Sequence, residues 1–165
     1  MNPRCLLAFS FALLLVTNVL ADGPVQNFTQ FPTGDVLRVR FNSGGCFHFY
    51  TYDLVFERAD TTRVSITSVQ QKWSERKQAY HDGESEKLGE FTLTPADLSG
   101  LDKLLAFYRE LAPGGCTTVD HVEISQWRSG ALIAREKFTD GTCARHSIPG
   151  MLTFPALARR LRQDN

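Results

Sequence analysis

The chain has few cysteines, no excess of either charge and none of the common catalytic or nucleotide-binding motifs. Its 18 lysines and arginines balance 18 aspartates and glutamates, which argues against a nucleic-acid or membrane-surface partner because both attract a clustered positive field. It has no Gly-x-Ser-x-Gly elbow, phosphate-binding loop or dinucleotide glycine fingerprint. The His-x-x-x-His and Cys-x-x-Cys spacings of metal sites are also missing. We therefore predict neither a metal nor a cofactor.

The first 21 residues have the pattern of a secretory signal peptide. Arg4 precedes an apolar run that reaches Val16, and Ala21 supplies a small residue before the expected cleavage site. The run is shorter than the ~20 apolar residues of a membrane span, so no stable membrane insertion is expected once it is removed. We predict export, either to a bacterial periplasm or as a secreted protein.

The remainder is expected to form one domain. Residues 22–34 contain two prolines and two glycines, which is typical of a lead-in segment. No low-complexity tract or long linker interrupts residues 35–165, and we predict a single domain over this range.

Three cysteines remain after Cys5 leaves with the signal peptide. In an oxidising compartment they would form one disulfide and leave one free thiol. Cys116 and Cys143 bracket a predicted hairpin, so we predict that they are bridged, which would stabilise the fold by ~3 kcal/mol in the chain-entropy model. The rival pair is Cys46 with Cys116, because each follows a Gly-Gly pair.

Alternating apolar residues and turn signals predict a sheet built from hairpins. The expected strands cover residues 35–41, 47–58, 63–69, 72–81 and 84–92, with a last hairpin within 119–138. Ser43-Gly44-Gly45 is expected to break the chain after the first strand. Asp82-Gly83, a strong two-residue hairpin signal, is expected to join the fourth and fifth strands.

The last hairpin allows two registers. A two-residue loop, Ser129-Gly130, places the two cysteines that flank the hairpin directly opposite each other. A three-residue loop, Arg128-Ser129-Gly130, pairs Glu123 with Arg135 but displaces the cysteines by one residue. We prefer the three-residue loop, with a bulge at Asp140-Gly141 that brings the cysteines back together.

Two helices are expected. Residues 95–112 have an amphipathic pattern, with Thr94 as N-cap, Pro95 at the first helical position and Asp97 in the first turn. A short closing helix is expected over 155–162, with its three arginines near the C-terminal end of the dipole. We predict an α+β fold: a mainly antiparallel sheet of hairpins, packed by one amphipathic helix and a short C-terminal helix.

Two groups of residues are candidates for function. Cys46 is a possible nucleophile, with His48 two residues further along the strand. Because Cys46 opens a strand rather than a helix, a disulfide partner or a buried small residue is the favoured interpretation. Tyr50, Tyr52 and His48 would be core residues under a covered sheet, or a recognition surface on an open one.

The stretch Ser43-Gly44-Gly45-Cys46-Phe47, followed by the strand Tyr52-Asp53-Leu54-Val55-Phe56, resembles the opening of a bacterial secreted-domain family of unknown function. In that family a similar turn leads into a strand and a leucine-rich helix follows, as it does here at 95–112. This chain lacks the family's second Cys-Pro after the turn. The resemblance implies export but no activity, because none is established for the family.

Together these features predict a non-catalytic binding or interaction module of the cell envelope or extracellular space. Its partner would be another secreted or envelope protein or a polysaccharide. The alternative is a small hydrolase or thiol-dependent enzyme that uses Cys46 with a nearby histidine such as His48.

Overall fold

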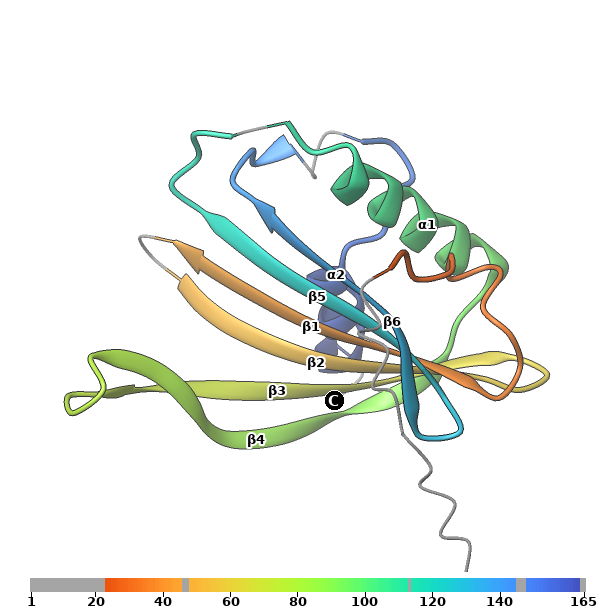
Figure 1. The fold of residues 1–165 in the computed structure, drawn as a ribbon, viewed down its shortest axis with the longest axis horizontal. Coiled ribbons are helices and arrows are strands. Elements are labelled where there is room, and N and C mark those ends of the chain that lie inside the picture. The colour runs from red at the N-terminus through yellow and green to blue at the C-terminus, as the bar shows by residue number, and fades with distance from the viewer. Residues whose placement is uncertain (1–22, 46–47, 113, 145–147, 164–165) are drawn as a thin grey trace, which may run out of the picture.

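The computed structural model describes residues 23–45, 48–112, 114–144 and 148–163. The predicted signal peptide and Cys46 lie outside these ranges. Within them, a six-stranded sheet of order β4-β3-β2-β1-β5-β6 is accompanied by two helices (Figure 1). The elements are β1 Asp35–Gly45, β2 His48–Arg58, β3 Thr62–Ser74, β4 Ala79–Thr92, α1 Pro95–Arg109, β5 Val119–Arg128, β6 Ala131–Asp140 and α2 Phe154–Gln163. All neighbouring strands are antiparallel, so the α+β prediction is confirmed at this level.

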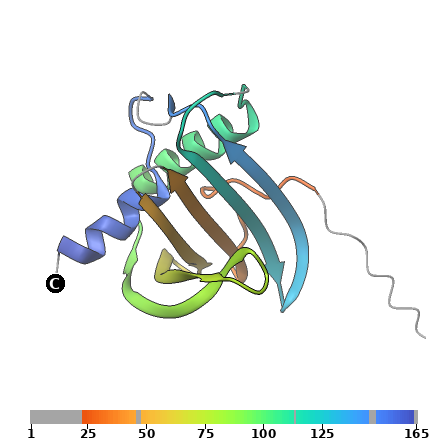
Figure 2. The same cartoon turned by 90° about the vertical axis from the view of Figure 1, so that its left-hand side faces the viewer.

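Both helices contact the same face of the sheet, which we call the inner face. Tyr108 of α1 stacks on Phe138 of β6, with ring centroids 5.5 Å apart. It also lies 6.4 Å from Phe154 of α2, and Phe154 lies 6.0 Å from Phe41 of β1. The sheet curves around these helices (Figures 1 and 2). One hydrophobic core therefore lies between the sheet and the two helices.

Strand alternation separates this core from a charged outer face. In β1, Leu37, Val39 and Phe41 are buried to 1% exposure or less. Arg38 and Arg40 alternate with them and point to the other face, because successive side chains of a strand lie on opposite sides. The alternation predicted from the sequence is thus the pattern that buries the core.

The start of α1 agrees with the prediction in detail. The Thr94 hydroxyl accepts a hydrogen bond from the Asp97 backbone N–H at 3.1 Å. In return, an Asp97 carboxylate oxygen accepts one from the Thr94 backbone N–H at 3.0 Å, which completes a capping box. The helix ends at Arg109, three residues earlier than predicted.

The segment expected as a lead-in is part of the core. Val25, Phe28 and Phe31 are at most 3% exposed, and the Phe28 ring meets Phe56 of β2 edge-on at 4.9 Å. The backbone N–H of Phe28 donates to the Asp102 carboxylate of α1 at 2.5 Å. Three apolar residues spaced between prolines and glycines carry no periodic signal, which is why the sequence did not reveal this role.

The predicted turn at Asp82-Gly83 is wrong. β3 and β4 are joined by residues 75–78, and Asp82 lies within β4, opposite Gln71. The Asp82 carboxylate accepts a hydrogen bond from Gln71 Nε2 at 2.8 Å and also pairs with Arg40 of β1. The pairing of β3 with β4 shifts register between Val69 and Gln71, and Gly83 lies opposite this shift. The glycine is therefore part of a β-bulge and not of a turn.

The break predicted at Ser43-Gly44-Gly45 is also wrong, because β1 runs through all three residues. Ser43 pairs with Tyr50 of β2 on one side and with Asp120 of β5 on the other. A Cβ on Gly45 would approach His48 Cε1 to 2.9 Å. The absence of a side chain on Gly45 therefore leaves room for the His48 ring beside the strand. In the sequence, a glycine that is needed for this close approach looks the same as a glycine in a turn.

In the last hairpin the preferred register is wrong. The loop has two residues, Ser129 and Gly130, both with positive φ, as a tight hairpin turn requires. The irregularity lies near this turn, between the pairs of Gln126 and Trp127, instead of at Asp140-Gly141. Glu123 consequently stands directly opposite Lys137, with which it forms an ion pair at 3.1 Å, and it pairs with Arg135 diagonally at 3.8 Å. Polar residues on both strands made the alternatives hard to separate by pattern alone.

The predicted bridge between Cys116 and Cys143 is confirmed. Their Cα atoms are 5.9 Å apart and their sulfur atoms are bonded. The backbone N–H of Cys116 also donates to the Gly141 carbonyl at 2.7 Å. The disulfide thus joins the segment before β5 to the segment after β6.

Candidate functional site

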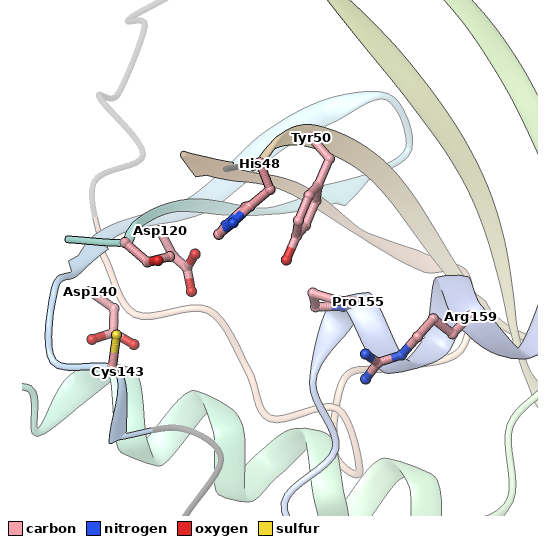
Figure 3. A pocket seen from close by; sticks show the side chains of 8 residues that line it. His48, Tyr50, Asp120, Asp140, Cys143, Pro155 and Arg159 are labelled. Atoms are coloured by element: carbon pink, nitrogen blue, oxygen red, sulfur yellow. The ribbon is translucent and has the colours of Figure 1, made fainter. Parts of the chain in front are cut away.

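A pocket of about 260 Å³ opens at one end of the inner face (Figure 3). Its walls come from the start of β2, the start of β5, the end of β6 and the first turns of α2. The lining residues are His48, Tyr50, Thr118, Asp120, Asp140, Cys143, Pro155 and Arg159.

The pocket begins where the apolar inner face ends. Phe41, Val122 and Phe138 are the last apolar inward residues on β1, β5 and β6. Two positions nearer the pocket on each strand, the inward residues are Ser43, Asp120 and Asp140. Asp120 pairs with Ser43 on one side and with Asp140 on the other. A row of polar side chains therefore follows the last apolar residues of the core on the inner face.

Two carboxylates in this row are nearly inaccessible to solvent. Asp120 and Asp140 are each 3% exposed and stand directly opposite each other on β5 and β6. Like charges at such positions repel, so each needs hydrogen-bond donors. Oδ1 of Asp140 accepts two from Thr142, from its backbone N–H and its hydroxyl, both at 2.7 Å. Asp120 has a partner of its own as well.

His48 and Tyr50 form the aromatic wall. Their rings stack with centroids 5.3 Å apart, and His48 Nε2 lies 3.1 Å from the hydroxyl oxygen of Ser43. His48 is exposed and Tyr50 is half-buried. Figure 3 shows both side chains descending from β2 toward the cavity.

Tyr52, the third residue of the predicted recognition surface, lies apart from this cavity. It is 6% exposed, and the guanidinium of Arg162 lies 5.9 Å from the centre of its ring. The structure therefore brings His48 and Tyr50 together at the pocket and places Tyr52 in the core beside α2.

The arginines of α2 have three different environments. Arg160 pairs with Asp97 at 2.7 Å, and Arg162 covers Tyr52. Arg159 reaches the pocket, where within the described part of the chain it has no ion-pair partner. Figure 3 places Pro155 and Arg159 on the side of the cavity away from Asp120 and Asp140.

The disulfide closes one side of the pocket, since Cys143 lines it. Cys46, the predicted nucleophile, lies outside the described residues. The hydroxyl within hydrogen-bond distance of His48 Nε2 belongs to Ser43, which is fully buried. Across the ranges that the structure describes, no group of three or more His, Cys, Asp or Glu side chains could hold a metal ion.

A second surface lies on the outer face, at the free end of the β3–β4 hairpin. Tyr80 stacks on Phe49 at 5.0 Å and meets Trp73 edge-on at 5.1 Å. The three residues are between 44% and 58% exposed. We call them the hairpin aromatic cluster. Phe49 lies between His48 and Tyr50 in sequence but on the opposite face of β2, so this cluster is separate from the pocket.

Sequence reasoning missed Asp120, Asp140 and Arg159. A usable signal was present: Asp120 lies in step with Val122 and Ile124 along β5, and therefore on the inward face. An aspartate at an inward position is costly unless hydrogen-bonded, and so it marks a special site. Arg159 could not be assigned in this way, because three arginines lie close together on one short helix.

Comparisons with protein-family models, curated proteins and solved structures found no match for this chain. In the described residues, no helix is both long and apolar enough to cross a membrane. The geometry of the pocket is thus the basis for inferring function.

Proposed function

We propose that the protein is an exported, non-catalytic binding module of the cell envelope or extracellular space, and that its ligand enters the inner-face pocket. The observation that carries the proposal is the pocket itself. It combines the buried carboxyl groups of Asp120 and Asp140 with the exposed ring of His48 and the guanidinium of Arg159. Arg159 has no ion-pair partner among the described residues. Sites for small ligands are typically concave, with a few converging polar groups on an otherwise apolar wall.

Two features support export. Residues 1–21 have the signal-peptide pattern, and the Cys116–Cys143 disulfide is typical of an oxidising compartment. The partner is then a molecule met outside the cytoplasm: another secreted or envelope protein, or a polysaccharide.

Binding is favoured over catalysis by the surroundings of His48. A catalytic histidine needs a nucleophile or substrate proton within reach. The serine hydroxyl that lies 3.1 Å from its Nε2 belongs to Ser43, which has no solvent-exposed surface from which to attack a substrate. The alternative, a small hydrolase or thiol-dependent enzyme, depends on Cys46. Labelling the mature protein with a thiol reagent at neutral pH tests it, because an activated thiolate reacts far faster than an ordinary thiol.

The binding proposal is tested by affinity capture from the native extracellular or envelope fraction. The immobilised mature protein is compared with His48→Ala and Tyr50→Ala, which change the pocket. Phe49→Ala is the matched control, since it removes an aromatic ring from the same strand but on the outer face. Captured material that is lost in both pocket variants and kept in the control supports the proposal.

Two other outcomes contradict it. Loss in Phe49→Ala alone would place binding at the hairpin aromatic cluster instead. Capture that is equal for all four proteins would mean that the pocket has no part in binding. Circular dichroism of each variant checks that the fold is retained.

A further inference from the structure

We propose that the inner-face pocket binds a polyhydroxylated ligand, namely one saccharide unit such as the end of a polysaccharide chain. This inference rests on the proposed binding function and names the ligand class of the same site.

The first argument is the mixture of hydrogen-bonding groups on the pocket wall. The Asp140 carboxyl oxygens accept hydrogen bonds, the Arg159 guanidinium donates them, and the hydroxyls of Tyr50 and Thr118 do both. A ligand that displaces water from these groups must replace the hydrogen bonds that they make with water, because a polar group that loses them without compensation is costly. Sugar hydroxyls both donate and accept, so a ring that carries several of them can meet each wall group with the required partner.

The same mixture disfavours other ligand classes. An anion such as phosphate or a carboxylate would face Asp120 and Asp140, which are directly opposed and each 97% buried. An ammonium group would face the guanidinium of Arg159 at the other side of the cavity (Figure 3). A hydrocarbon would displace the water around the guanidinium of Arg159 and offer it no hydrogen-bond acceptor in return.

The second argument is the apolar part of the wall. Tyr50 is fixed by ring contacts on two sides, with His48 at 5.3 Å and Phe41 at 6.1 Å. Pro155 borders the cavity from α2 (Figure 3). A sugar ring has C–H groups between its hydroxyls, and an aromatic side chain with a polar tip suits such an amphipathic surface.

The third argument is size. The cavity of about 260 Å³ lies just below the ~300–1,000 Å³ of sites that enclose drug-sized ligands. It therefore suits one ring rather than several, and its open side leaves room for the remainder of a chain outside.

The test is a titration of the oxidised mature protein with glucose, galactose, mannose and N-acetylglucosamine and with short oligosaccharides of each. Saturation-transfer NMR detects binding, and calorimetry gives Kd. Inorganic phosphate and the tetramethylammonium ion serve as anionic and cationic probes. We expect at least one saccharide to bind with a Kd in the millimolar range or tighter, and neither charged probe to compete with it.

Two variants place the saccharide in the pocket. Asp140→Asn removes one negative charge but keeps an oxygen for the Thr142 hydrogen bonds, and Arg159→Gln removes the guanidinium. Each should weaken binding by about 10- to 100-fold, the usual effect of losing a charged hydrogen-bond partner. Arg76→Gln, in the turn between β3 and β4, is the charge-matched control and should leave Kd unchanged. Thermal unfolding confirms that each variant is folded.

The inference is overturned if no saccharide in the panel binds, if phosphate or tetramethylammonium competes, or if both pocket variants bind like the wild type. Saccharide binding that is lost in Trp73→Ala and kept in the pocket variants would assign the ligand to the hairpin aromatic cluster, and this also overturns it. If no saccharide binds but affinity capture still depends on Tyr50, then the proposed ligand class is wrong and the proposed binding function stands.

Discussion

Replacing Asp97 with asparagine removes the charge that joins the start of α1 to α2. One carboxylate oxygen of Asp97 accepts hydrogen bonds from the Thr94 backbone N–H and hydroxyl, at 3.0 and 2.9 Å. The other accepts one from Arg160 at 2.7 Å. The bond from Arg160 is the main reason that the pKa of Asp97 is lowered from 3.8 to about 2, with the Thr94 hydrogen bonds adding to it against the opposing effect of burial.

The magnitude follows from this pKa. A tenfold change in proton affinity is worth about 1.4 kcal/mol, so lowering the pKa from 3.8 to about 2 corresponds to about 2 kcal/mol of folding stability. Because the pKa is lower in the folded protein, this stabilisation is fully present above pH 3.8. It is lost as the pH falls from about 4 to about 2.

The assay is urea unfolding of the oxidised protein, followed by circular dichroism at pH 7 and at several values between pH 4 and pH 2. Asp97→Asn should cost about 2 kcal/mol at pH 7, and most of this difference from the wild type should disappear by pH 2. Asp60→Asn, in the exposed turn between β2 and β3, is the control and should change little at any pH.

Arg160→Gln should reproduce much of the loss, and the double variant with Asp97→Asn should add little to either single one, since both remove the same interaction. A difference at pH 2 as large as that at pH 7 would refute the reasoning, because the effect would then not come from the carboxylate charge.

Three further predictions concern stability and use the same urea assay at pH 7. Replacing both Cys116 and Cys143 with serine should cost about 3.5 kcal/mol, from the sequence separation of 27 residues; adding reductant should destabilise the wild type and leave this variant unchanged. Phe28→Ala should cost about 3–5 kcal/mol, because its ring is fully buried; an unchanged midpoint would show that the segment before β1 is not part of the core. Gly89→Ala should cost about 1–3 kcal/mol, because the glycine has φ +142 and a new Cβ would lie 3.2 Å from Leu161; a variant as stable as the wild type would contradict this account.

The elements with strong local signals were predictable from the sequence. The start of α1 was correct because Thr94, Pro95 and Asp97 act through bonds within one turn. The inward-facing residues of β1 were predicted correctly because a central strand buries every second side chain. The disulfide was correct because its cysteines flank one hairpin, whatever the register.

The errors arose where distant contacts outweigh a local preference. Asp82-Gly83 has the composition of a turn, but Asp82 is held by Arg40 from β1, a contact across the sheet that no local pattern reveals. The glycines after Ser43 resemble a break, although pairing on both sides keeps them in the strand.

The site was predictable only in part. His48 and Tyr50 were identified because an aromatic strand is conspicuous. Asp120 and Asp140 meet through the pairing of β5 with β6, and the register of that pairing was predicted wrongly. Arg159 lines the same pocket from the opposite side, on α2, whose position depends on the whole core.

The irregular ladder of β4 also affects how this protein meets its neighbours. β4 is an edge strand, and a long regular edge would offer a row of free N–H and C=O groups to any other extended chain. The ladder between β3 and β4 is interrupted twice along its length. The charged residues Glu86 and Lys87 lie between the interruptions, and Glu84 lies within one of them. An incoming strand would find no long matching stretch, so this edge resists sheet extension and the aggregation that follows from it.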